Sequence, residues 1–181
     1  MPHTFAWLPA SYRSTVLMIL FTVTAFLAFA LRVQGRPLVT DAAPHGIISY
    51  ELAWSVDRAQ DILESWEPLE GTARRQLYLD FGFVLVYPPL LALGCAMLAG
   101  SRFSGSAPVG AFLSWAILAA APLDAIENLA LLGMIAHGAD RSRALIAAWC
   151  AGLKFVLAYA GLGYILLAGP GVLIGRMRAL G

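Results

Sequence analysis

Four long apolar stretches alternate with polar segments along the chain. The stretches cover approximately residues 14–33, 75–99, 108–136 and 143–168. A helix needs about 20 mostly apolar residues to cross a bilayer, and each stretch reaches that length. Residues that cap or end helices, among them Thr72, Gly100 and Ser106, lie between the stretches. The pattern therefore predicts an all-α, polytopic membrane protein, in which residues 1–181 form a single domain of four transmembrane helices in a bundle.

The only sizeable polar region, residues 34–74, lies between the first and second stretches. Over about residues 50–66, apolar side chains from Leu52 to Trp66 recur at steps of three and four, while Asp57, Asp61 and Glu64 occupy the opposite face. This spacing predicts an amphipathic helix in the first loop. Such a helix lies either in the membrane interface or over the mouth of the bundle.

Composition supports a membrane protein and excludes several other classes. Of the 181 residues, 60% are hydrophobic and 13% are charged, and the mean hydropathy is +0.74. A soluble globule of this size needs more polar surface. The net charge of +1 provides no basic surface for nucleic acid, so we expect no nucleic-acid partner.

Cysteine and histidine are placed without the spacing of a metal site. Cys95 and Cys150 lie singly in apolar stretches, and His3, His45 and His137 lie in three separate segments. We therefore interpret the cysteines as packing residues and expect neither a metal nor another cofactor.

Polar side chains interrupt the second and third stretches on shared helical faces. Asp124, Glu127 and Asn128 follow one another at i, i+3 and i+4 and form one polar stripe. Asp80 and Tyr87 are seven residues apart on one face of the second stretch. Gln76 precedes Asp80 by one turn.

The fourth stretch contains one cation, Lys154. It shares its face with small residues, including Ala147, Ala151 and Gly161. Small residues mark the side of a membrane helix that packs closely on its neighbours, so Lys154 should point into the bundle. A rise of about 1.5 Å per residue places Lys154 and the polar residues of the second and third stretches between one interface and the midplane, where they can meet.

The buried polar residues predict a site in which not every carboxyl is charged. Three carboxyls face one lysine, which leaves a net charge of −2 if all are ionised. Desolvation and repulsion should therefore keep at least one carboxyl protonated near neutrality. The candidate catalytic residues are Asp80, Asp124 and Glu127, and the candidate ligand-binding residues are Gln76, Tyr87, Asn128 and Lys154.

Two other interpretations compete for the same residues. A buried salt-bridge network could simply fix the register of the helices. The pair Asp124-x-x-Glu127 could bind Mg²⁺ for a diphosphate substrate, but no second aspartate-rich motif accompanies it, so we predict no metal site.

The layout and a few residues resemble the emopamil-binding and sigma-2-receptor (EXPERA) group of sterol-related membrane proteins. In LYLDFGFVLVYPP, Asp80 and Pro88 match the acid and the later proline of the group's second helix. Asp124 in PLDAIEN and Lys154 match polar positions of its third and fourth helices. The resemblance implies a hydrophobic, sterol-like ligand. The first stretch departs from the group's sterol isomerase, because its polar residues are threonines such as Thr22 and none is acidic.

Three short motifs are similar to those of a family of small bacterial four-helix integral membrane proteins. They are GII-x-x-ELA at residues 46–53, LDF at residues 79–81 and D-x-x-EN at residues 124–128. This second resemblance implies a location in the bacterial inner (cytoplasmic) membrane but no particular activity.

The leading functional hypothesis is an intramembrane acidic pocket for a membrane lipid, an isoprenoid-like ligand or another hydrophobic small molecule. If the protein is an enzyme, a protonated carboxyl would isomerise or otherwise transform the ligand by proton transfer. One alternative is a component of a proton- or cation-coupled transporter, which with four helices would need to form a homo-oligomer. Another alternative is a structural or assembly subunit of a membrane complex.

Overall fold

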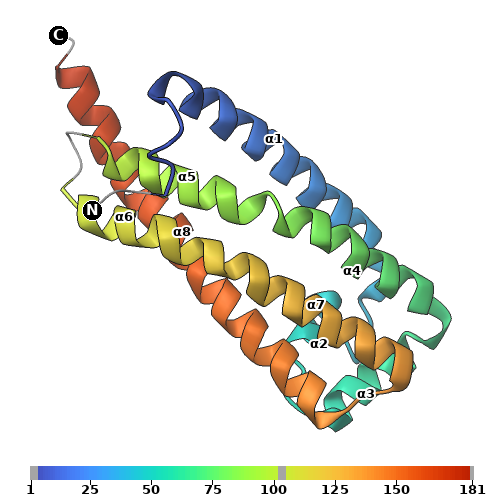
Figure 1. Cartoon of the computed structure of the whole chain (residues 1–181). Helices are drawn as coiled ribbons and strands as arrows, with labels where there is room; N and C mark the ends of the chain where they lie inside the picture. Colours follow the sequence, from blue (N-terminus) through green and yellow to red (C-terminus); the bar gives the residue numbers. More distant parts are fainter. Residues whose placement is uncertain (1–3, 102–104, 180–181) are drawn as a thin grey trace. The chain divides into compact units, whose positions relative to one another are not determined.

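The protein is described here by a computed structural model, which covers residues 4–101 and 105–179 (Figure 1). All regular elements in these two ranges are helical, as predicted. The α-helices are α1 (Ala10–Gln34), α2 (Ile47–Glu51), α3 (Val56–Ser65), α4 (Glu70–Val84), α5 (Tyr87–Ala99), α6 (Ala107–Ala116), α7 (Ala120–His137) and α8 (Arg141–Arg178). Short 3-10 turns occupy Arg36–Leu38, Glu67–Leu69 and Ile117–Ala119.

Four helical stretches are long and apolar enough to cross a membrane. They are Ala10–Gln34, Glu67–Ala99, Ala107–His137 and Arg141–Gly175. Each contains one of the four predicted apolar stretches, so the number and order of the candidate spans are confirmed. The bundle arrangement stays a prediction.

The second candidate span is interrupted between α4 and α5. α4 ends at Val84, and α5 begins at Tyr87 with Pro88 in its first turn. Proline has no N–H to donate, and its ring clashes with the carbonyl four residues earlier, which here belongs to Val84. The proline therefore explains why the helix stops and restarts at this point.

Residues of the chain group into two compact units, which we describe separately. The first consists of Met1–Thr24, Val86–Ala121 and Phe155–Gly181, and the second consists of Ala25–Leu85 and Pro122–Lys154. The first unit has a core that includes Ala92, Cys95, Ile117 and Tyr164. A single domain, as expected from the sequence, stays a prediction.

The first loop supplies much of the core of the second unit. Tyr50 and Trp66 pack edge to face with ring centroids 5.3 Å apart. The Trp66 indole donates to the Leu38 carbonyl at 2.9 Å, and the Tyr50 hydroxyl donates to the Leu131 carbonyl at 3.3 Å. Because these aromatic side chains are buried, the loop is tied to α7 by packing as well as by the Tyr50 hydrogen bond.

The predicted amphipathic helix over residues 50–66 is wrong in its boundaries. Its regular part is the shorter α3, while Glu51 ends the separate helix α2. Trp54, between them, has a φ of 57°, which interrupts a right-handed helix. Ser55 then caps α3, since its side chain accepts a hydrogen bond from the backbone N–H of Arg58. The apolar face of α3 buries Ala59 and Ile62 in the core of the second unit.

Candidate functional site

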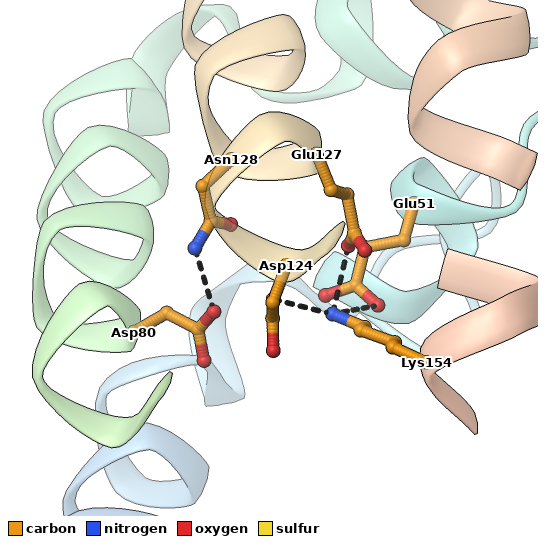
Figure 2. A network of polar contacts seen from close by, with 6 residues as sticks. All are labelled: Glu51, Asp80, Asp124, Glu127, Asn128 and Lys154. Carbon is orange, nitrogen blue, oxygen red and sulfur yellow. Dashed lines mark hydrogen bonds and ion pairs between the residues drawn. The ribbon is translucent and has the colours of Figure 1, made fainter. Parts of the chain in front are cut away.

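Three carboxylates surround a single ammonium in the core of the second unit. Lys154 of α8 lies 2.8 Å from Asp124 Oδ1 and 2.9 Å from Glu127 Oε1, measured from its Nζ. Glu51 Oε2, at the end of α2, lies 3.6 Å from the same nitrogen. None of the four side chains is more than 8% exposed. Figure 2 shows the carboxyl groups converging on the amine from two different helices.

A second polar pair lies next to this group. The side-chain amide of Asn128 donates a hydrogen bond of 2.7 Å to Asp80 Oδ2, which joins α7 to α4. In Figure 2, Asp124 lies between this pair and Lys154. Asp80 is only partly buried, whereas Asp124 and Asn128 are buried. We call Glu51, Asp80, Asp124, Glu127, Asn128 and Lys154 together the acidic cluster.

The geometry of α7 explains why its three polar residues reach two partners. In an α-helix, residues three and four apart lie on one face, but neighbouring positions differ by about 100° around the axis. Glu127 and Asn128 therefore diverge, and one meets Lys154 while the other meets Asp80. Asp124, one turn earlier, lies between their directions, and its Oδ1 accepts a hydrogen bond from the Lys154 ammonium.

Charge is strongly unbalanced in the acidic cluster. Four carboxyls and one ammonium leave a net charge of −3 if all five groups are ionised. Burial raises the pKa of the Glu51 carboxyl above its ordinary value. The positive charge of Lys154 opposes this shift without cancelling it, and the negative charge of Asp124 adds to it. The arrangement therefore favours a proton on Glu51 at pH values where an exposed glutamate has lost it.

Several buried oxygens have no hydrogen-bond donor within the part of the chain that the structure describes. They include Glu51 Oε2, Glu127 Oε2 and Asn128 Oδ1. The carboxyls of Glu51 and Glu127 lie on the same Lys154 nitrogen, at 3.6 Å and 2.9 Å. Because two carboxylates can only accept, a proton held between them would supply the missing donor.

Five of the seven site residues expected from the sequence lie together in the acidic cluster: Asp80, Asp124, Glu127, Asn128 and Lys154. Gln76 is buried elsewhere in the second unit, where its amide nitrogen would be 2.9 Å from a Cβ placed on Gly35. Tyr87 is buried in the first unit. The catalytic and ligand-binding roles of all seven residues stay predictions.

Glu51 is the member of the acidic cluster that the sequence analysis did not select. It is the last residue of α2, and the structure leaves it only 6% exposed. The GII-x-x-ELA motif at residues 46–53 was the available signal. The three motifs of the bacterial resemblance together contain Glu51, Asp80, Asp124, Glu127 and Asn128.

A cavity of about 310 Å³ lies outside the acidic cluster, between α3, α4 and α7. Its lining includes Trp66, Ala73 and Met134, and none of the six cluster residues contributes to it. Among the residues that the structure covers, no group of three or more His, Cys, Asp or Glu side chains is placed to hold a metal ion. The cluster carboxyls instead gather on the amine of Lys154.

Comparison of the chain with protein-family models, curated proteins and solved structures finds no match. Both resemblances drawn from the sequence therefore stay predictions, and the functional argument depends on the chemistry of the acidic cluster.

Proposed function

We propose that this chain is an integral membrane protein with four transmembrane helices, whose acidic cluster binds a lipid or isoprenoid-like ligand and transforms it by proton transfer. The observation that carries the proposal is the excess of carboxyls over cations in a buried group, with three of them on the single ammonium of Lys154. Such a group is a proton store in an otherwise apolar protein.

Full ionisation of the acidic cluster is too costly to be its resting state. An uncompensated charge in the membrane interior costs at least about 2.5 kcal/mol, and like charges at short range add to this cost. Lys154 can neutralise one carboxylate completely, and Asn128 can stabilise a second through its hydrogen bond. At least one of the remaining carboxyls keeps its proton at neutral pH, which makes it available as a general acid.

The different exposures of the four carboxyls suggest different roles. Asp80 is the only one that is not buried, so it is the carboxyl that can touch a ligand. Asn128 orients it through the 2.7 Å hydrogen bond. Glu127, which is fully buried, lies beside Lys154 and stores the proton that the ligand receives.

A proton-transfer isomerisation fits this arrangement without any further reactant. The protonated carboxyl of the acidic cluster gives its proton to one carbon of a carbon–carbon double bond, and the electron pair of that bond forms the new C–H bond. A carboxylate then removes a proton from the carbon next to the cation, and that C–H pair becomes the shifted double bond. The cluster ends with the same number of protons, and nothing is oxidised or reduced.

Deuterium incorporation tests the proposed chemistry. The purified protein in lipid nanodiscs would be incubated in D₂O with a total lipid extract of the membranes that produced it, and the lipids would then be analysed by mass spectrometry. We expect one lipid to gain deuterium at carbon with the wild-type protein. Glu127→Gln should abolish this gain, while Asp61→Asn, which changes an exposed acid of α3, should not affect it.

The same variants separate the proposal from its alternatives. A coupled transporter would move protons across a proteoliposome membrane in a Glu127-dependent manner without labelling any lipid. A purely structural cluster would lose folding yield in Glu127→Gln, with no labelling and no flux in the wild type. Absence of carbon-bound deuterium in every lipid would overturn the proton-transfer chemistry.

A further inference from the structure

The fold delivers Glu51 to the acidic cluster on a short, bracketed segment of the first loop. α2 has only five residues, and Glu51 is the last of them. Gly46 before it has a φ of 58° and a ψ of −128°, a conformation that glycine adopts far more readily than other residues. Trp54 after it has a φ of 57°. The segment between these two points is connected to the rest of the loop by backbone bends rather than by continuous helix.

Two aromatic contacts hold this segment in place. Tyr50 directly precedes Glu51 in the sequence, and its ring is buried against Trp66. Trp54 lies edge to face with Trp149 of α8, and their ring centroids are 5.3 Å apart. The Trp54–Trp149 contact is at the surface, since both side chains are exposed. It is therefore the contact that can open without unfolding the buried core.

Of the three carboxyls that contact Lys154, Glu51 is also the one furthest from the ammonium. Its oxygen is 3.6 Å from Nζ, compared with 2.8 Å and 2.9 Å for the carboxyls on α7. The charged and titratable groups that face it are Lys154 of α8, Asp124 and Glu127 of α7, and, further away, Asp80 of α4. On the loop side, Ile48 and His45 are exposed. Glu51 is itself buried, at 6% exposure, but it is carried by a loop segment that has these exposed residues.

We infer that Glu51 is the proton-loading residue of the acidic cluster: it takes a proton from water on the side of the first loop and passes it to Glu127. This inference rests on the proposed function and names the route by which the proton store exchanges its proton with water. A hydronium ion protonates the Glu51 carboxylate and leaves as water. The proton then moves to the neighbouring Glu127 carboxylate, which lies on the same Lys154 nitrogen, and Glu51 regains its negative charge. The Lys154 ammonium keeps its own proton throughout.

Infrared spectroscopy of the purified protein measures this loading without any ligand. The carbonyl stretch of a protonated carboxyl shifts when H₂O is replaced by D₂O, so the rate of the shift is the rate of proton exchange with bulk water. We expect Glu51→Gln to slow the exchange by about 10²-fold, the lower end of what a positioned proton-transfer group contributes. Asp61→Asn in the same loop region should exchange at the wild-type rate.

A reversible cross-link tests the same route without removing the carboxyl. In a background of Cys95→Ala and Cys150→Ala, Trp54→Cys and Trp149→Cys would be joined by a short disulfide-containing bis-maleimide. Cross-linking should slow the exchange by a similar factor because it keeps residue 54 beside α8 and so limits the access of water to Glu51. Reduction should restore the rate in the same sample. The singly substituted Trp54→Cys protein, treated identically, should not change.

The outcomes distinguish the inference from the proposed function. Wild-type exchange rates in both Glu51→Gln and the cross-linked protein would overturn Glu51 as the loading residue and leave the lipid-labelling result intact. Slow exchange in both, together with no lipid labelling, would keep the loading route and remove the proposed isomerisation. If Glu51→Gln does not fold, the cross-link alone decides, since it leaves all four carboxyls in place.

Discussion

Substitution of Lys154 by methionine is the perturbation that addresses the balance of charge most directly. Methionine keeps the length and apolar stem of the side chain but removes the ammonium. The substitution leaves the carboxyls of Asp124, Glu127 and Glu51 buried, each of them within 4 Å of the lost cation. They must then either remain charged without a partner or take up protons from solvent.

The expected loss of stability follows from these contacts. Removing one partner of a buried ion pair typically costs about 3–5 kcal/mol, and at 5% exposure Lys154 is buried enough for this range to apply. Proton uptake limits the loss, because protonating a carboxylate becomes easier by about 1.4 kcal/mol for each unit by which the pH falls. We therefore expect Lys154→Met to lower the free energy of unfolding by about 3–5 kcal/mol at pH 7 and by much less at pH 5.

Denaturant unfolding in detergent, followed by tryptophan fluorescence, measures this difference. Trp66 is well placed as a reporter, since it is 1% exposed in the core of the second unit. Arg58→Met is the control, because it removes an exposed cation and should change the free energy of unfolding by less than about 0.5 kcal/mol. Adding Glu127→Gln to Lys154→Met should recover part of the loss. A Lys154→Met protein as stable as the wild type at both pH values would refute the argument.

Three further predictions follow from individual contacts. Burial raises the pKa of Glu51, so the stability that its protonated form contributes is present below the ordinary pKa of a glutamate and is lost as the pH rises through the raised pKa. Glutamine cannot titrate, so Glu51→Gln should make the free energy of unfolding fall less between acidic and neutral pH. Asn128→Ala should cost about 1–3 kcal/mol in the same assay, because it leaves the carboxyl bonded to it without its donor; an unchanged midpoint would mean that this bond is not formed. Gly110→Ala places a methyl group against the ring of Tyr164 and should cost about 1–3 kcal/mol, whereas Gly163→Ala, with open space around it, should be neutral or slightly stabilising in thermal unfolding.

The apolar pattern predicted the candidate spans because a membrane helix must satisfy its backbone internally and present apolar side chains over its whole length. The stripe of Asp124, Glu127 and Asn128 was equally visible, since helical spacing alone places these residues on one side of the helix. The small residues beside Lys154 indicated the inward direction of its side chain. For these positions, local geometry was sufficient.

The position of Glu51 could not be predicted in the same way. Trp54, whose positive φ separates α2 from α3, packs against Trp149 of α8, and this tertiary contact is not encoded by the spacing of residues in the loop. A carboxyl in a polar loop is usually solvated. Glu51 instead reaches Lys154, because the tertiary contacts of the preceding residue, Tyr50, hold this part of the loop against α7. Gln76 was expected at the site because it lies one turn from Asp80, but it packs against Gly35.

The most direct test of the account counts the protonated carboxyls of the wild-type protein at pH 7. Infrared spectra of the protein in nanodiscs should contain a carbonyl band of a buried, protonated carboxyl, and this band should disappear in the Glu51→Gln/Glu127→Gln double variant and persist in Asp61→Asn. A spectrum without such a band at pH 7 would mean that all four carboxyls of the acidic cluster are ionised, and it would contradict the claim that the cluster stores a proton.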